Sequence, residues 1–202
     1  MMTQRERMEA GLLYNSANEE LFQARIRAKH LTFEFNRCDP ADVEKRKEIL
    51  RELMGEQADK AWIEAPFYCD YGDNIEVGEN FYSNTNLTIL DCAPVRFGDN
   101  VLIGPNVGIY TAGHPVHPDH RTSTWEYARE IRVGNCVWIG GGVTINPGVT
   151  IGDNTVVASG SVVTKDIPAN VIAGGNPAKV IREITDEDRK YYFKNLPYDK
   201  GE

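Results

Sequence analysis

Long apolar runs and paired cysteines are both missing from this 202-residue sequence. No stretch is apolar over the roughly 20 residues that a membrane helix needs, and the first ten residues, MMTQRERMEA, carry charges instead of an apolar signal core. The four cysteines lie at least 23 residues apart, so they form neither a CxxC pair nor a zinc-binding spacing. We therefore expect reduced thiols, no membrane partner, no bound metal and a cytoplasmic protein.

Positive charge is also in short supply. Lysine and arginine number 22 against 30 acidic residues, which gives a formal net charge of −8. This balance argues against non-specific binding to nucleic acid or to an anionic membrane surface. It does not argue against a small anionic ligand, because such a ligand responds to local charge.

What the sequence does contain is a hexapeptide repeat from Ile131 to Ile167. Ile or Val recurs every six residues, each followed by a small or turn-forming residue, at Val133, Ile139, Ile145, Ile151, Val157 and Val163. A second row keeps the same period at Val137, Val143, Val149, Thr155, Ser161 and Ile167. A period of six fits neither an α-helix nor a flat strand. Three such units would form one triangular coil, and stacked coils would bury the apolar row between parallel strands, so the pattern predicts a parallel β-helix.

The repeat begins earlier in the chain and is interrupted once. Two further groups of positions keep the spacing of six, separated by a two-residue shift: Val77, Ser83 and Ile89, then Phe97, Ile103 and Ile109. The pattern then stops until Ile131, so residues 111–130 should leave the coil as a protruding loop, a kind of segment that often carries function. Because this loop has little apolar content, we expect it to lie against a neighbouring subunit.

The N-terminal segment should be helical. Ser16 and Glu19 have the form of a capping box, and Asp42 marks the start of a second helix that Gly55 ends. These helices would cap the open first coil, whose strand edges would otherwise be exposed. A sharper interpretation is that they also cover part of an active site.

The chain is thus expected to form one structural domain in three parts. A helical cap would span 1–60, and a β-helix with the protruding loop 111–130 would span 61–184. A C-terminal helix and tail would span 185–202, with the helix itself running from Thr185 to Asn195. The fold class is mainly β, and the tail should close the far end of the coil.

The loop contains three of the four histidines, His114, His117 and His120. Pro115 and Pro118 argue against a helix that would place the three imidazoles on one face, so the spacing does not favour a zinc site. We expect His117 and His120 to be solvated. His114 lies directly beside the coil, where a rigid strand end can hold it, and a histidine there can act as a general base near neutral pH.

Several segments together resemble the maltose and galactoside O-acetyltransferases, which are hexapeptide-repeat enzymes that use acetyl-CoA. The segments are NFYSNTN, LDCAPVRFGDN, TAGHP, VWIGGGVTINPGVTIGDNTVVASGSVVTKDIP and GGNPAKVI. The resemblance covers nearly the whole chain, including the N-terminal helices. It implies a left-handed β-helix, a homotrimer with active sites between subunits, acetyl-CoA as co-substrate and a small-molecule sugar as acceptor.

The same resemblance implies site residues. The catalytic base would be His114, and the Gly141 amide would stabilise the developing oxyanion. The acceptor would contact Asn84 and, on weaker matches, Arg25, Asp70, Cys92 and Glu126. The remaining contacts to acetyl-CoA would come from Gly104, Trp138, Ser159, Thr164, Lys165, Lys179 and Arg182.

Without the resemblance, several of these residues have ordinary structural interpretations. Asn84 occupies a tight corner, where asparagine is common, and Trp138 would simply cover the coil surface. The run Gly140-Gly141-Gly142 is either a tight corner or a set of backbone amides left uncovered for a thioester. The basic residues after the repeat would be solvated, although their grouping in an acidic protein favours a phosphate-bearing ligand.

Three positions depart from the pattern of the family. Cys92 stands where some galactoside enzymes have an acid, and Ser16 stands where some have an aspartate. Arg129-Glu130 precedes the returning strand where a proline is usual. Because of Cys92, the identity of the acceptor stays open. The Arg129-Glu130 segment affects how the loop is held.

We expect direct transfer of the acetyl group. His114 would take the proton of an acceptor hydroxyl, the 6-hydroxyl by resemblance, as that oxygen attacks the thioester, and would then return the proton to the thiolate. No cysteine lies in an activating setting. Three alternatives remain: an N-acyltransferase for an amino sugar or antibiotic, a non-catalytic scaffold, and a γ-type carbonic anhydrase, which needs histidines that residues 131–167 lack.

Overall fold

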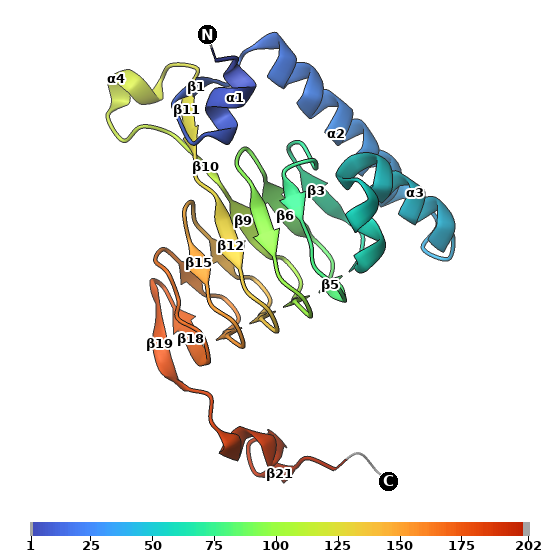
Figure 1. Ribbon diagram of the computed structural model, residues 1–202, viewed down its shortest axis with the longest axis vertical. Coiled ribbons are helices and arrows are strands. Elements are labelled where there is room, and N and C mark those ends of the chain that lie inside the picture. Colours follow the sequence, from blue (N-terminus) through green and yellow to red (C-terminus); the bar gives the residue numbers. More distant parts are fainter. Residues whose placement is uncertain (1, 200–202) are drawn as a thin grey trace.

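The computed structural model describes residues 2–199, and most of them form a left-handed parallel β-helix (Figure 1). Three sheets make the sides of a triangular prism. The four-stranded sheet consists of β4 (Ile75–Glu76), β7 (Val95–Phe97), β12 (Ile131–Val133) and β15 (Thr150–Ile151). The five-stranded sheet consists of β3 (Phe67–Cys69), β6 (Leu87–Leu90), β9 (Gly108–Tyr110), β14 (Thr144–Ile145) and β17 (Val162–Val163).

The seven-stranded sheet forms the third side. Its strands are β2 (Ala61–Ile63), β5 (Phe81–Ser83), β8 (Leu102–Ile103), β13 (Trp138–Ile139), β16 (Val156–Val157), β18 (Val171–Gly175) and β19 (Ala178–Glu183). All neighbours in this sheet are parallel except β18 and β19, which pair antiparallel and close the coil. Each full coil visits the four-, seven- and five-stranded sheets in that order, so each corner of the prism lies between two particular sheets.

The two rows of the hexapeptide repeat are buried, as the period predicts. Ile139, Ile145 and Val157 are each 0% exposed, and the second row, including Thr155 and Ser161, is also buried. The two hydroxyls in that row donate to backbone carbonyls inside the corners, with Thr155 Oγ1 lying 2.9 Å from the oxygen of Pro168. Burying one Val or Ile side chain contributes about 1.5–3 kcal/mol, so the repeated rows supply most of the stability of the coil.

Helices cover the first coil at the N-terminal end (Figure 1). They are α1 (Gln4–Glu9), α2 (Glu19–Arg37), α3 (Val43–Met54) and the 3₁₀ helix η1 (Glu56–Lys60). The start of α3 is as predicted, because the Asp42 side chain accepts from the backbone N–H of Lys45, and Gly55 ends it with φ 83°. Asn36 of α2 both donates to and accepts from the backbone of Phe67, which ties the helix to the edge strand β3.

The predicted capping box at Ser16 is wrong. The residue before α2 is Asn18, and it makes no side-chain cap. Ser16 instead donates its backbone N–H and its hydroxyl to the carbonyl oxygen of Thr124, at 2.9 and 3.0 Å. A tertiary contact with the loop therefore takes the hydroxyl that local spacing assigned to a helix cap.

The protruding loop leaves the coil after β9, as predicted. It packs against its own chain, so it does not need a neighbouring subunit for this contact. Its strands β10 (Ala112–Gly113) and β11 (Trp125–Ala128) pair antiparallel, and β11 also pairs with β1 (Tyr14–Asn15) of the same chain. The tip contains a one-turn helix, α4 (Pro118–Arg121), with Pro118 in its first turn, where a proline is tolerated. Of the three loop histidines only His120 lies within this helix, so it does not place all three imidazoles on one face.

The C-terminal helix expected from Thr185 to Asn195 is also wrong. Thr185 precedes the first turn and donates its backbone N–H to the Asp188 carboxylate over 2.9 Å, but only a 3₁₀ turn follows, η2 (Asp186–Arg189). A short hairpin follows, β20 (Tyr191–Phe193) and β21 (Leu196–Pro197), and Figure 1 shows this tail extending away from the coil. The closing element is β19 instead. Within residues 2–199, no helix is both long and apolar enough to cross a membrane.

Candidate functional site

A cavity of about 420 Å³ lies at the corner between the five- and four-stranded sheets. We call it the acceptor cavity. The turns that follow β3, β6 and β9 form its floor, and α2 and the β1–β11 pair form its walls. Five ionisable side chains from separate parts of the chain line it, namely Arg25, Lys29, Asp70, His114 and Glu126. Together with Cys92, which lines the same cavity, five of the predicted site residues therefore converge here.

The buried carboxylate of Asp91 organises the floor. It is 0% exposed and accepts the backbone N–H groups of Asp70, Tyr71 and Gly72 at 2.9, 2.9 and 2.7 Å. Burial raises the pKa of Asp91 to about 6, although these three hydrogen bonds favour its ionised form. Asp91 thus fixes the turn that carries Asp70 into the cavity. No prediction from the sequence covered Asp91, and its only sequence signal is its place at the two-residue shift in the repeat.

Arg25 is held by two other parts of the wall. Its guanidinium donates to the hydroxyl of Tyr71 and to the backbone oxygen of Ser16, each at 2.7 Å. Lys29, one turn further along α2, forms no side-chain hydrogen bond or ion pair within residues 2–199. Arg25 therefore links the floor of the cavity to the N-terminal segment, whereas the ammonium group of Lys29 is available to a ligand in the cavity.

Cys92 is neither an exposed nucleophile nor a solvent-facing side chain. It is 4% exposed, and its thiol donates to Asp70 Oδ2 over 3.6 Å. Burial raises the pKa of the Cys92 thiol well above its ordinary value, and the nearby Asp70 carboxylate adds to the shift. Burial also raises the pKa of Asp70. A neutral thiol at this position agrees with a mechanism that uses no cysteine nucleophile.

His114 lies at the mouth of the acceptor cavity, directly after β10. It is exposed and forms no hydrogen bond or ion pair with the described part of the chain. The preceding glycine explains its position, because a Cβ on Gly113 would lie 2.6 Å from the hydroxyl of Tyr127, its partner on β11. The close β10–β11 contact therefore depends on this glycine, and this contact determines the position of the backbone that carries His114.

A second groove, of about 540 Å³, lies at another corner of the prism, between the seven- and five-stranded sheets. We call it the cofactor groove. It brings together five residues that the sequence assigned to the site: Asn84, Gly104, Trp138, Gly141 and Ser159. Trp138 is 54% exposed along this groove, so its ring is available to a ligand. Among residues 2–199, none lines both the groove and the acceptor cavity.

The three consecutive glycines beside Trp138 differ in their hydrogen bonding. The amides of Gly140 and Gly142 donate to the oxygens of Val157 and Pro105, each at 2.8 Å. The Gly141 amide donates to no atom among residues 2–199. Both interpretations from the sequence thus apply, since the outer glycines form a tight corner and the middle one leaves a backbone donor free at the groove.

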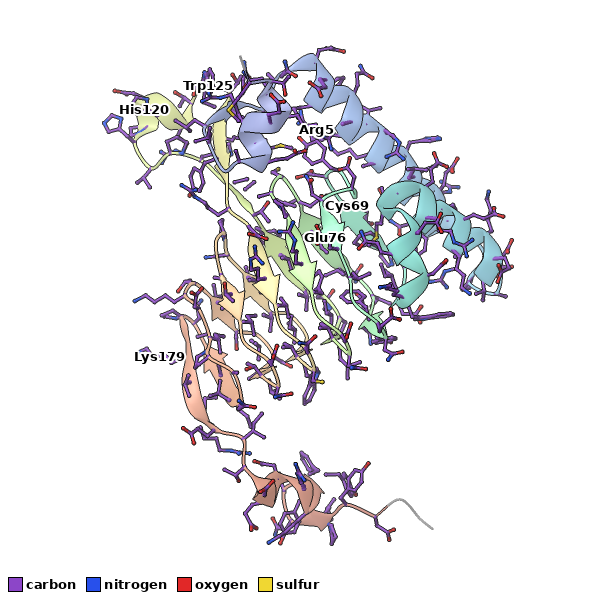
Figure 2. The ribbon with its side chains drawn as sticks, in the orientation of Figure 1. Arg5, Cys69, Glu76, His120, Trp125 and Lys179 are labelled. Atoms are coloured by element: carbon purple, nitrogen blue, oxygen red, sulfur yellow. The ribbon has the colours of Figure 1, made fainter. Side chains whose placement is uncertain are left out.

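The basic residues predicted to bind a cofactor do not form one cluster on a single chain. Lys179 lies on β19 opposite Gly174, and Figure 2 shows it pointing outward from this hairpin. Lys165 and the preceding Thr164 follow β17 at the end of the five-stranded sheet, away from the groove. Arg182 donates to both carboxylate oxygens of Asp188, at 2.8 and 2.7 Å, so it anchors the tail.

Comparison with known proteins places the chain in a family. Residues 7–57 match the model described as maltose acetyltransferase hexapeptide capping motif, and residues 130–165 match bacterial transferase hexapeptide (six repeats). Galactoside O-acetyltransferase of Escherichia coli (strain K12) is 52% identical over 194 residues, which cover 96% of this chain and 96% of that protein. The chain belongs to the maltose and galactoside O-acetyltransferase family.

Two solved structures of family members are similar over nearly their whole length. A galactoside acetyltransferase in complex with coenzyme A has a TM-score of 0.92 and 49% identity, covering 98% of this chain and 100% of that one. A maltose O-acetyltransferase from Clostridium difficile 630 has a TM-score of 0.89 and 48% identity, covering 92% and 99%. The resemblance inferred from the sequence motifs is confirmed.

Two departures of this family member now have structural explanations. Glu130, in the Arg129-Glu130 segment that precedes the returning strand, forms ion pairs with Arg96 and Arg132, the latter at 2.8 Å. These pairs hold the returning strand β12 beside its neighbour β7. Cys92 packs beside Asp70, which supplies a carboxylate to the cavity from the adjacent turn.

The loop histidines beyond His114 lie at the exposed tip. The rings of His117 and His120 are 5.8 Å apart, and Figure 2 shows His120 projecting from α4 away from the coil. His117 accepts from the backbone N–H of Asp119. Within the described residues, no group of three or more His, Cys, Asp or Glu side chains could hold a metal ion.

Proposed function

We propose that this protein transfers the acetyl group of acetyl-CoA to a hydroxyl of a small sugar, such as maltose, glucose or a galactoside. The proposal rests on the presence of two chemically different cavities in this member of the family. One holds a histidine beside two carboxylates, and the other holds a free backbone amide beside an exposed tryptophan. A relative's structure in complex with coenzyme A supports assigning the second cavity to the cofactor.

The acceptor cavity suits a polyhydroxyl ligand. Asp70 and Glu126 can accept hydrogen bonds from sugar hydroxyls, and Lys29 can donate to ring or hydroxyl oxygens. We assign Arg25 and Cys92 to the walls of this site, where they hold groups that face the sugar. His114 at the mouth would take the proton from the attacking hydroxyl, which we propose is the primary 6-hydroxyl.

The cofactor groove fits a thioester with a long, phosphate-bearing arm. Bound acetyl-CoA would supply the electrophilic carbonyl. The free Gly141 amide would donate to the carbonyl oxygen as negative charge develops there, which is the usual role of an oxyanion hole. Gly104 keeps this amide reachable, because a Cβ at that position would lie 2.5 Å from the Gly141 nitrogen. Trp138 and Ser159 line the groove, and Lys179 lies beyond it.

His114 then has two proton transfers to perform. It accepts the hydroxyl proton as the new carbon–oxygen bond forms, and it delivers that proton to the departing sulfur as the carbon–sulfur bond breaks. The histidine ends as it began, so no net proton stays on the enzyme. Its exposed position at the loop leaves both ring nitrogens free for this exchange.

We further propose that the working unit is a homotrimer with the active site between subunits. The two cavities lie at different corners of the prism, so on one chain the five-stranded sheet separates His114 from Gly141. A neighbour related by a closed rotation would bring its groove to the mouth of the acceptor cavity. The chain that carries His114 would also bring its own Thr164 and Lys165, which lie at the same corner of the prism, to the neighbour's groove. Asn84 of that groove would then gain an acceptor-side role. We keep cytoplasmic localisation as a prediction.

The test is an acceptor screen with labelled acetyl-CoA. The panel contains maltose, glucose, a β-galactoside, their 6-deoxy forms and an amino sugar. We expect ester formation on the first three and none on the 6-deoxy sugars. Amide formation on the amino sugar alone would instead identify an N-acyltransferase, and no transfer to any acceptor would contradict the proposal.

A further inference from the structure

Tyr14 is a buried residue at the acceptor cavity that neither the repeat nor the family motifs single out. It is 0% exposed, and its hydroxyl donates to Glu126 Oε2 over 3.0 Å. A buried hydroxyl needs a hydrogen-bond partner, and here the partner is a carboxylate that lines the cavity. Tyr14 itself offers no surface to a ligand.

The pairing of two short strands creates this contact. Tyr14 on β1 lies directly opposite Glu126 on β11 in the antiparallel register. Residues opposite each other in such a pair point to the same face, so the two side chains must meet. The neighbouring contacts of Ser16 with Thr124 and of Arg25 with Ser16 fix the same strand from either side.

The ring and the hydroxyl of Tyr14 have separate roles. The ring belongs to a small apolar cluster with Met8, Leu21, Tyr71 and other buried residues, which attaches the N-terminal segment to the coil. The hydroxyl reaches past this cluster to Glu126. Burial raises the pKa of Tyr14 far above its ordinary value, so the phenol stays neutral and remains a donor at any physiological pH.

We propose that Tyr14 is a positioning residue for acceptor recognition: its hydroxyl holds the Glu126 carboxylate in the orientation that binds a hydroxyl group of the acceptor. A glutamate side chain has three rotatable bonds, and without this donor the carboxylate would sample solvent at the cavity mouth. The inference rests on the proposed function, and it adds the chemical class of the interaction. The acceptor must offer a hydroxyl donor to Glu126.

The N-terminal segment therefore affects acceptor binding indirectly. It does not touch the acceptor, yet it carries the donor that fixes one of the two carboxylates there. The other carboxylate has a matching arrangement, because the buried Cys92 thiol donates to Asp70. Each acid of the cavity is thus held by one buried, neutral donor.

The test compares Tyr14→Phe with its parent. This substitution keeps the ring and removes only the hydroxyl, so folding should persist. We expect kcat/KM for the sugar to fall roughly tenfold or more, the range that loss of a hydrogen bond to a charged group supports, with the change mainly in the acceptor KM. The KM for acetyl-CoA should stay within about twofold of the parent value. Tyr68→Phe, at an exposed tyrosine outside both cavities, is the matched control and should behave as the parent.

A double-mutant cycle with Glu126→Ala separates positioning from a structural effect. If Tyr14 acts through Glu126, Tyr14→Phe causes no further loss in the Glu126→Ala background. Glu126→Asp, which keeps the charge but shortens the reach, should reproduce the rise in acceptor KM and serves if Tyr14→Phe does not fold. Parent-like sugar kinetics in Tyr14→Phe, or an equal loss in both backgrounds, would overturn the inference. If the parent itself acetylates no sugar, it is the proposed function that fails.

Discussion

Asn84 and His114 lie at different corners of the β-helix, on opposite sides of the five-stranded sheet. Asn84 follows β5 and lines the cofactor groove, whereas His114 follows β10 and lines the acceptor cavity. Both were assigned to the same reaction from the sequence. Because a single chain keeps them apart, the proposed mechanism needs a second chain to bring them together.

Removal of the imidazole gives the first prediction. His114→Ala should lower kcat by roughly 10²- to 10⁴-fold, the usual size of a general-base effect. Because His114 makes no hydrogen bond within the described residues, folding and acetyl-CoA binding should not change. Circular dichroism and a binding isotherm for acetyl-CoA provide the controls. Turnover close to that of the parent would remove His114 from this role.

The second prediction concerns the cysteine in the cavity. Cys92→Ala removes the thiol that donates to Asp70 but no nucleophile, so kcat should stay within about tenfold of the parent value and the acceptor KM should rise. Pre-incubation with a thiol-alkylating reagent should act slowly because the thiol is buried and neutral. Complete loss of turnover in a folded Cys92→Ala protein, together with an acetylated Cys92 in the parent, would point to a covalent route instead.

Asp91 gives a prediction for pH dependence. Its folded-state pKa of about 6 lies above the ordinary aspartate value, so the folded protein binds this proton more tightly than the unfolded chain. The resulting contribution to stability, on the order of 3 kcal/mol, is present below about pH 4 and is lost as the pH rises through about 6.

The matched variant is Asp91→Asn, which cannot titrate. The difference in free energy of unfolding between parent and variant, measured by urea titration at several pH values, should therefore change between about pH 4 and 6 and be flat above about 7. In the parent, protonation below about pH 6 should also weaken the three backbone hydrogen bonds and raise the acceptor KM. A pH-independent difference across the whole range would contradict this assignment.

Charge at the cofactor end gives a further prediction. Lys179→Glu and Lys165→Glu should each raise the KM for acetyl-CoA several-fold, about what one lost phosphate contact supports, and leave the sugar KM nearly unchanged. Lys47→Glu on α3, outside both the acceptor cavity and the cofactor groove, is the control for net charge. Arg182 is a poor choice here, because its ion pair with Asp188 anchors the tail. A change in the sugar KM alone would mean that the cofactor end is misplaced.

Much of the fold could be predicted because the repeat itself encodes it. The buried rows at Ile139 and Val157 and the exit of the loop after Ile109 follow directly from the period. Local rules failed where tertiary contacts compete with them. Ser16 has the spacing of a helix cap, but pairing with Thr124 takes its hydroxyl, and the tail after Thr185 continues as a hairpin after a single turn.

The candidate site was predictable in its residues but not in its geometry. Sequence motifs selected His114, Asp70 and Gly141, and the structure places the first two in one cavity and the third in another. Tyr14 and Asp91 could not be found in the same way, since their roles depend on strand register and burial. Neither property is visible in a local motif.

In the proposed mechanism, catalysis needs His114 of one subunit and the cofactor groove of another, and mixing two inactive variants measures this requirement. His114→Ala keeps the groove, and Gly141→Trp keeps the histidine but blocks the groove. Random reassembly at equal amounts gives about three quarters mixed trimers, each with one intact site of three. Because one site in three is then intact in three quarters of the trimers, we expect about one quarter of the parent activity after the two variants are refolded together. No recovery, despite mixed trimers confirmed by native mass spectrometry, would contradict it.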